Sequence, residues 1–246
     1  MSEIPSPDRS DESTHVGSAD IVDTHNSAGT PNPAVLLDGV VALLGAFPAL
    51  AGFDLQVDAS EIVLLAGPNG AGKTTVLRLC AGLVEPAAGN AVVLGVDLSK
   101  HRRSVRGRVG LAGHDAGLYP DLSVNENMAF FTEAARLGGT GAQPGDRSAA
   151  LDRMGVDQRL RDLPVRSLST GQRRRCSFAA LLVRRPELWL LDEPHAGLDE
   201  AGRDLVDELV AQAAEAGATV LFASHELDRA EELAGRCVSI SAGTAT

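Results

Sequence analysis

The segment from Gly67 to Thr74 (GPNGAGKT) limits what this chain can fold into more than any other feature. It follows a strand-like, mostly apolar run at residues 61–66, and it precedes apolar residues spaced three and four apart, as on one face of a helix. Strand, glycine-rich turn and helix form the context in which GxxxxGK[ST] binds phosphate. The glycines let main-chain N–H groups approach phosphate oxygens, and the helix N-terminus favours the anion. We therefore expect a nucleoside triphosphate site rather than a chance glycine-rich loop.

The side chains of this loop have separate expected roles. Lys73 supplies a positive charge for the β- and γ-phosphates, and Thr74 supplies a hydroxyl for magnesium. The predicted nucleotide-binding residues are Gly67, Pro68, Asn69, Gly70, Ala71, Gly72, Lys73, Thr74 and Thr75.

Further motifs follow in a definite order. Residues 168–172 (LSTGQ) precede a basic, helix-compatible segment at residues 173–185, and a strand-like run then ends in Asp192-Glu193. The residues 194–199 (PHAGLD) come next, and a second buried-strand run at residues 219–223 ends in Ser224-His225. From about Leu36 to Gly243 this order resembles the ATP-binding subunits of ABC transporters. The LSGGQ signature, here LSTGQ, is absent from P-loop kinases and GTPases.

Apolar strands alternate with amphipathic helices, which indicates an α/β fold with a mainly parallel sheet. Two apolar stretches between Val35 and Val57, separated by Pro48 and Gly52, predict antiparallel strands. Helical segments are expected at 124–137, 147–154 and 200–216, with a flexible turn at 138–146. By resemblance the chain is a P-loop ABC ATPase at residues 34–243, with an antiparallel β subdomain and a small helical subdomain at about 118–172. Residues 1–33, rich in Ser, Asp, Thr and Pro, are expected to be a disordered acidic tail.

The residues after the buried strands are the expected catalytic groups. Asp192, at the carboxyl end of its strand, can face magnesium together with Thr74. The resemblance makes Glu193 the general base that polarises water, with a surface acidic pair as the alternative reading. It makes His225 the switch histidine that bonds the γ-phosphate. His114 stands where most of the family has a glutamine that links magnesium to the membrane partner, and His195 is treated as local variation.

The signature loop implies that two copies act together. In the family, Ser169 and Gly171 of the signature contact the γ-phosphate of the opposite subunit in a head-to-tail homodimer, and Asp199 joins the two sites. The full predicted signature set is Leu168, Ser169, Thr170, Gly171 and Gln172. No aromatic residue stands at the usual adenine-stacking position near Leu44-Gly45, and Phe47 is the nearest candidate.

Composition limits the partners. The net charge of −11 argues against non-specific nucleic-acid binding, because a phosphate backbone requires basic surface. Three distant cysteines without a CxxC pair predict reduced, buried thiols rather than disulfides or zinc. The N-terminus has no signal-peptide pattern, and the longest apolar run, from Val40 to Phe53, is too short to span a bilayer. We expect a cytoplasmic protein that is peripheral on the inner face of the membrane, with no membrane insertion of its own and with an integral membrane partner.

One group of these transporters is more similar than the rest. Gly113-His114, residues 117–119 (GLY) and residues 122–127 (LSVNEN) resemble the CcmA-type ATP-binding proteins of cytochrome c biogenesis, described as haem-exporter subunits. The short stretch after His225 agrees with this. The resemblance implies an ATP-hydrolysing motor with magnesium as cofactor. An exporter ATPase for drugs or lipids is the alternative, and a soluble non-transport ABC protein is a third reading that lacks its usual second cassette or coiled-coil insertion.

Overall fold

The structure is a computed structural model that describes residues 32–113, 117–138, 142–143 and 145–245. The predicted acidic tail therefore lies outside the described residues, apart from its last two positions. The chain after Thr30 forms one compact unit.

A central sheet carries the buried strands. Its strand order is β10-β9-β3-β8-β7-β6. The strands are β3 (Ile62–Ala66), β6 (Val109–Ala112), β7 (Leu188–Asp192), β8 (Thr219–Ala223), β9 (Arg236–Ser241) and β10 (Thr244–Ala245). All neighbouring pairs are parallel except β9 and β10. Since β8 is buried along its whole length, an unbroken apolar run is what this position requires. The predicted mainly parallel sheet is confirmed.

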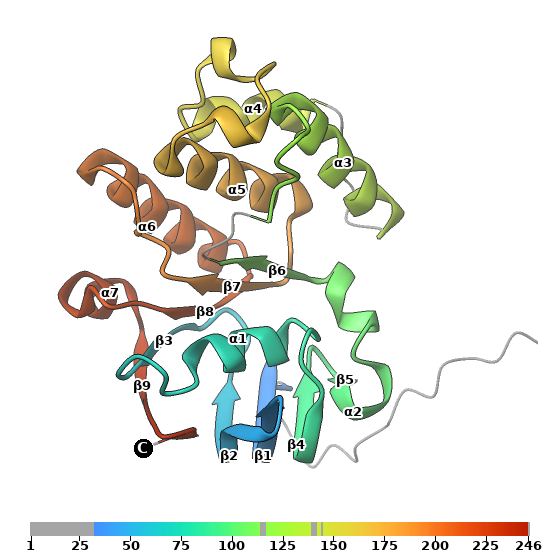
Figure 1. The fold of residues 1–246 in the computed structure, drawn as a ribbon, viewed down its shortest axis with the longest axis vertical. Helices are drawn as coiled ribbons and strands as arrows, with labels where there is room; N and C mark the ends of the chain where they lie inside the picture. Colours follow the sequence, from blue (N-terminus) through green and yellow to red (C-terminus); the bar gives the residue numbers. More distant parts are fainter. Residues whose placement is uncertain (1–31, 114–116, 139–141, 144, 246) are drawn as a thin grey trace, which may run out of the picture. The chain divides into compact units, whose positions relative to one another are not determined.

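Helices cover both faces of this sheet. The helices of the described residues are α1 (Lys73–Cys80), α2 (Leu98–His101), α3 (Val124–Leu137), α4 (Asp146–Arg153), α5 (Thr170–Arg184), α6 (Glu200–Glu215) and α7 (Leu227–Leu233). Of these, α1 covers one face of the sheet, and α5 and α6 cover the other. Alternate residues of β3 face opposite sides: Val63 and Leu65 belong to the core shared with α1, and Leu64 to the core shared with α5 and α6. Figure 1 shows α1 on one side of the sheet and α5 and α6 on the other.

A second, antiparallel sheet packs beside α1. Its order is β2-β1-β4-β5, formed by β1 (Val35–Leu44), β2 (Phe47–Val57), β4 (Pro86–Val93) and β5 (Val96–Asp97). The predicted antiparallel strands are confirmed, but the predicted break is wrong. The turn lies at Gly45, whose φ is +63°, while Pro48 and Gly52 lie inside β2. Gly52 (φ +74°) sits where the β1–β2 register shifts, and Pro48 is near the end of an edge strand, where a missing N–H is tolerated.

The helices that follow β6 agree closely with the sequence. The segments predicted at 124–137 and 147–154 appear as α3 and α4, and both pack against α5. Ser123 begins α3 with a reciprocal capping box to Glu126, and Gly217 (φ +99°) follows α6. Residues 139–141 and 144 of the turn predicted at 138–146 lie outside the described residues, and Asp146 already begins α4. The limits of the helical subdomain stay a prediction.

The cysteines agree in part with the sequence reading. Cys80 and Cys176 are buried, and burial raises the pKa of each thiol to about 12, which makes both inert. Cys237 is exposed on β9, so the prediction of a buried thiol is wrong there. Among the described residues no helix has both the length and the apolar character needed to cross a membrane.

Candidate nucleotide site

The phosphate loop joins β3 to α1 and is shaped by its glycines. Gly67 has a φ of +147°, and a Cβ there would lie 2.2 Å from the main-chain oxygen of Ile240. The Lys73 ammonium group donates to the carbonyls of Gly67 (2.6 Å) and Pro68 (3.1 Å), and its side chain is buried. The loop therefore wraps around a cation at the N-terminus of α1, an arrangement suited to an anion.

The loop and the ends of two central strands form one cavity of about 350 Å³. Its lining consists of Leu44, Ala49, Asn69, Gly70, Ala71, Gly72, Lys73, Thr74, Thr75, Arg78, Asp192, Glu193 and His225. The structure thus brings together most of the predicted loop residues and the three predicted groups from β7 and β8. A larger cavity, of about 710 Å³, lies among α4, α5 and α6 and contains none of these motif residues.

Two oxygen donors meet at the floor of the smaller cavity. The Thr74 hydroxyl donates to an Asp192 carboxylate oxygen over 2.8 Å, although the residues are 118 positions apart. A hydroxyl and a carboxylate at the phosphate loop are the donor types that magnesium prefers alongside phosphate oxygens and water. The pair fits a magnesium ion chemically.

Glu193 and His225 face each other at the rim. The main-chain N–H of His225 donates to Glu193 Oε2 (3.0 Å), and His225 Nε2 lies 3.1 Å from Glu193 Oε1. The Glu193 backbone is in the left-handed region, with a φ of +53°, which is uncommon for a residue with a side chain. This conformation turns the carboxylate away from the strand direction and toward the strand end that carries His225.

The signature residues form a separate hollow of about 470 Å³, lined by Ser169, Thr170, Gly171, Gln172, Arg175, Gly197, Leu198 and Asp199. Ser169 caps α5, and its hydroxyl and main-chain N–H exchange hydrogen bonds with Gln172 over 3.2 and 2.9 Å. The predicted Leu168 is buried beneath this end of the helix. None of the residues that line this hollow also lines the phosphate-loop cavity.

Asp199 connects the signature to α6. It caps α6 through the N–H of Gly202 (3.1 Å) and accepts a hydrogen bond from Arg175 (2.8 Å). The hydrogen bond from Arg175, followed by that from Gly202, lowers the pKa of the Asp199 carboxyl. The carboxylate therefore remains charged beside the signature at neutral pH.

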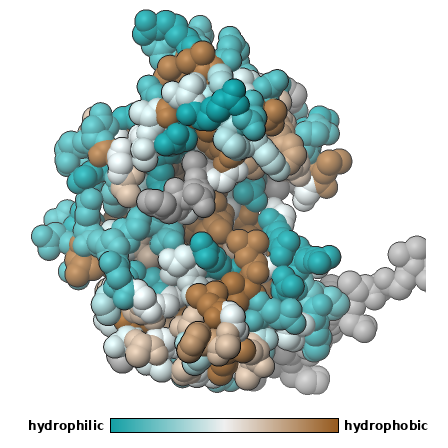
Figure 2. Space-filling model, in the orientation of Figure 1, coloured by the Kyte–Doolittle hydropathy of each residue, from teal (hydrophilic) through white to brown (hydrophobic). Residues whose placement is uncertain are grey.

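Some functional candidates differ from the sequence reading. His114 lies outside the described residues. Phe47 is 78% exposed and does not line the cavity, whereas Leu44 does. Figure 2 shows apolar surface in the lower part of the view, where Figure 1 places β1, β2 and β4. The cavity residues Ala49 and Arg78 belong to none of the sequence motifs. Arg78 could have been suggested by its place on α1 just after the loop, whereas Ala49 reaches the cavity from β2.

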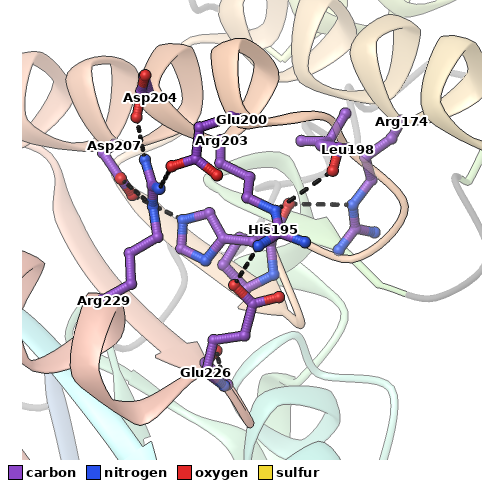
Figure 3. A network of polar contacts seen from close by, with 11 residues as sticks. Arg174, His195, Leu198, Glu200, Arg203, Asp204, Asp207, Glu226 and Arg229 are labelled. Carbon is purple, nitrogen blue, oxygen red and sulfur yellow. Dashed lines mark hydrogen bonds and ion pairs between the residues drawn. The ribbon is translucent and has the colours of Figure 1, made fainter.

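His195, read from sequence as local variation, is a buried structural contact. Its Nε2 lies 2.6 Å from an Asp207 oxygen on α6, and Nδ1 has no hydrogen-bond partner in the described part of the chain. Arg229 on α7 donates to the other Asp207 oxygen (2.6 Å) and also bonds Glu200 and Asp204 (Figure 3). Arg203 on α6 bonds Glu226, the neighbour of His225 (2.9 Å). The helix after Asp199 is therefore bonded to the segments that follow both Glu193 and His225.

Comparison with known proteins identifies the family. The ABC transporter family matches residues 50–196, which is more than half of the chain and includes the phosphate loop, the signature and Glu193. The cytochrome c biogenesis ATP-binding export protein CcmA 2 of Cupriavidus metallidurans is 37% identical over 175 residues, covering 71% of this chain and 81% of the relative. The chain belongs to the ABC transporter ATP-binding family. This chain is therefore an ABC-type ATP-binding cassette.

Other relatives of the cassette differ in their named roles. The daunorubicin/doxorubicin resistance ATP-binding protein DrrA of Streptomyces peucetius is 37% identical over 215 residues, covering 87% of this chain. The cassette spans only 64% of the length of that relative. The solved dimeric, post-hydrolysis structure of the ATP-binding cassette MJ0796 with ADP and Pi superimposes with a TM-score of 0.77 at 23% identity, over 86% of this chain and 96% of the other. This likeness establishes the fold.

Proposed function

We propose that this cassette binds and hydrolyses magnesium ATP as the motor subunit of an ABC exporter. The observation that carries the proposal is the single cavity that joins Lys73, the Thr74–Asp192 pair and the Glu193–His225 pair. These are the phosphate anchor, the metal-binding oxygens and the base that phosphoryl transfer to water requires, and they come from three different strand ends.

Each group has a defined task in this proposal. Lys73, held at the loop mouth, neutralises charge on the terminal phosphates. Glu193 accepts the proton of the attacking water, and His225 holds the carboxylate through its N–H and faces the same space through its ring. Thr74 and Asp192 would hold magnesium, which when bound neutralises phosphate charge and orients the nucleotide.

The proposed active species is a head-to-tail homodimer. The signature hollow and the phosphate-loop cavity have different linings, so Ser169 and Gly171 serve a phosphate loop of a second copy. The N-terminus of α5, which Ser169 caps, has the field and the free N–H groups for a γ-phosphate. The dimeric structure of the MJ0796 cassette supports this arrangement.

The named roles of the relatives suggest which partner and cargo to propose. We propose an integral membrane subunit as partner, a position on the cytoplasmic face of the membrane, and haem-exporter-like transport in cytochrome c biogenesis. The similarity to CcmA 2, a cytochrome c biogenesis ATP-binding export protein, supports this choice. Export of a drug or lipid is the second candidate, favoured by the 87% of this chain that DrrA matches.

Two experiments test the ATPase activity and the choice of partner separately. Purified cassette with magnesium ATP should release phosphate, and this activity should need Lys73 and Glu193; a folded wild-type cassette that binds no ATP contradicts the motor. Affinity purification of the cassette from native membranes should then recover an integral membrane protein. A recovered cytochrome c maturation subunit supports haem-type export, while a drug or lipid permease supports the second candidate. Recovery only with ribosomes or DNA contradicts both.

A further inference from the structure

Arg174 is a buried arginine that bonds the main chain of the catalytic turn. It lies on α5 directly after the signature, with 5% of its surface exposed. Its guanidinium donates to the carbonyl oxygens of Asp192 (2.7 Å), Glu193 and Pro194 (3.4 Å). Three consecutive carbonyls thus converge on one side chain, which Figure 3 shows pointing from its helix toward the loop that carries His195.

Arg174 has unusual hydrogen-bond partners for a buried cation. All hydrogen bonds of Arg174 within the described residues go to main-chain oxygens, and the guanidinium also lies 5.8 Å from the centre of the Phe178 ring. Burial lowers the pKa of Arg174, while the nearby charges of Asp192 and Glu193 raise it. A charged group taken from water and directed at carbonyls is costly unless its geometry is well satisfied. Its position is therefore fixed by the carbonyls that it binds.

Those carbonyls belong to a strained turn. Glu193 has a φ of +53°, a conformation that persists only where the surroundings hold it. On its N–H side Glu193 donates to the Ala223 carbonyl (2.9 Å). On its carbonyl side Glu193 accepts hydrogen bonds from Arg174 and, over 3.2 Å, from the main-chain N–H of Ala196. Arg174 is the side chain among these contacts, which together fix both peptide planes of the residue whose carboxylate faces His225.

The same guanidinium reaches a third segment. It donates to the carbonyl of Gly113, the last described residue before the loop that contains His114. Arg174 therefore joins the helix that begins at Ser169, the turn of Glu193 and the end of β6.

We propose that Arg174 is a positioning residue for hydrolysis: it holds the left-handed turn at Glu193 in register with the signature helix. This inference rests on the proposed function, since it assigns Arg174 to the reaction of Glu193. Arg174 does not line the nucleotide cavity, so it acts on the carboxylate through the backbone and leaves ATP binding to the phosphate loop. Lysine cannot replace it, because one ammonium group cannot span three carbonyls as a planar guanidinium does.

The test uses Arg174→Lys and Arg174→Gln in the full chain. Misplacing a reacting group by about 1 Å costs about 100-fold in rate, so we expect kcat to fall ~10- to 100-fold in both variants. The ATP dissociation constant should change less than about twofold, because the phosphate loop is untouched.

Arg184→Gln is the matched control. Arg184 lies at the other end of α5, is also desolvated, and also donates to main-chain carbonyls, those of Val109 (2.8 Å) and Arg106 (3.4 Å). Its loss should lower stability by a similar amount while the folded cassette keeps its kcat. Equal losses of kcat in Arg174→Gln and Arg184→Gln would show that Arg174 serves stability alone, and that would overturn the proposal.

Hydrogen exchange of the nucleotide-free cassette provides a readout independent of turnover. The amides of Glu193, His195 and Ala196 should exchange ~10-fold faster in Arg174→Gln than in wild type, and this difference should be absent in Arg184→Gln. Unchanged exchange together with a wild-type kcat would overturn the positioning role. If wild type itself lacks ATPase activity while the exchange difference is present, the proposed function fails and the backbone contact of Arg174 stands.

Discussion

Glu193 shows how one residue combines strain with chemistry. Its left-handed backbone brings a carboxylate from the end of β7 to within 3.1 Å of the His225 ring at the end of β8. A residue that continued the strand normally would direct its side chain to one face of the sheet. The left-handed backbone is held by the Ala223 carbonyl on its N–H side, and by Arg174 and the Ala196 N–H on its carbonyl side.

Replacing the carboxylate by its amide tests the base directly. Glu193→Gln keeps the size of the side chain and a hydrogen-bond acceptor for the His225 N–H, but it cannot take a proton from water. Turnover should fall by about 100-fold or more, the usual contribution of a general base. ATP binding should persist, and a dimer should accumulate in ATP on size exclusion. A Glu193→Gln cassette that turns over ATP at the wild-type rate would remove the base assignment.

Lys73 is proposed to bind ATP, so its loss should weaken ATP affinity, unlike the loss of Glu193. Lys73→Ala removes a charged donor that the loop already holds in place. Hydrogen bonds to charged groups contribute about 1.5–3 kcal/mol, so ATP affinity should fall about 10- to 100-fold. Equilibrium binding of a fluorescent ATP analogue measures this. Wild-type affinity in Lys73→Ala would exclude the lysine from phosphate binding.

At the scale of elements, α6 connects the two catalytic strand ends. Asp207 accepts from both His195, after Glu193, and Arg229, on the helix after His225. Asp199 at the start of the same helix borders the signature. Movement of α6 must therefore displace both segments unless these bonds break.

Asp207→Asn tests the contribution of this connection. The change removes a charged acceptor shared by buried His195 and Arg229, so the free energy of unfolding should fall by ~1–3 kcal/mol. Asp204→Asn is the matched control, one turn away on α6 and bonded to the same Arg229 but 67% exposed, and it should cost less than about 1 kcal/mol. Urea unfolding of the two variants gives the comparison. Equal costs would mean that the His195 contact contributes nothing.

The ion pair between Glu61 and Arg236 connects the start of β3 to β9, and it should make the free energy of unfolding depend on pH. Hydrogen bonds from Arg236 lower the pKa of Glu61, against an opposing effect of burial. A lowered folded pKa stabilises the fold above the unfolded pKa, and this stability is lost as pH falls through the folded pKa. The difference in unfolding free energy between wild type and Glu61→Gln should be positive at about pH 7 and shrink toward about pH 3. A difference that is the same at both pH values contradicts the ion pair.

Across the whole molecule, the sequence predicted what local pattern determines. Unbroken apolar runs located β3, β7 and β8, and apolar residues three and four positions apart located α1 and α6. The strand boundary predicted at Pro48 and Gly52 was wrong, because β2 is an edge strand with register shifts and can contain both residues. Arg174 was hidden in a basic segment that reads as a solvated helix face, and His195 meets Asp207 only because α6 folds back over the loop. Such contacts depend on tertiary packing that no local period encodes.

The phosphate-loop cavity and the signature hollow share no lining residue, which supports the proposal that two copies of the cassette complete each other's sites. The most direct measurement is the ATPase activity of a mixture of Lys73→Ala and Ser169→Arg cassettes, each inactive alone. A heterodimer places the intact phosphate loop of the Ser169→Arg copy against the intact signature of the Lys73→Ala copy. ATPase activity should return on mixing. It should reach no more than about half of the wild-type rate per dimer, because only one of the two sites in each heterodimer is intact. A mixture no more active than either variant alone, with heterodimers demonstrated by differential tagging, would contradict it.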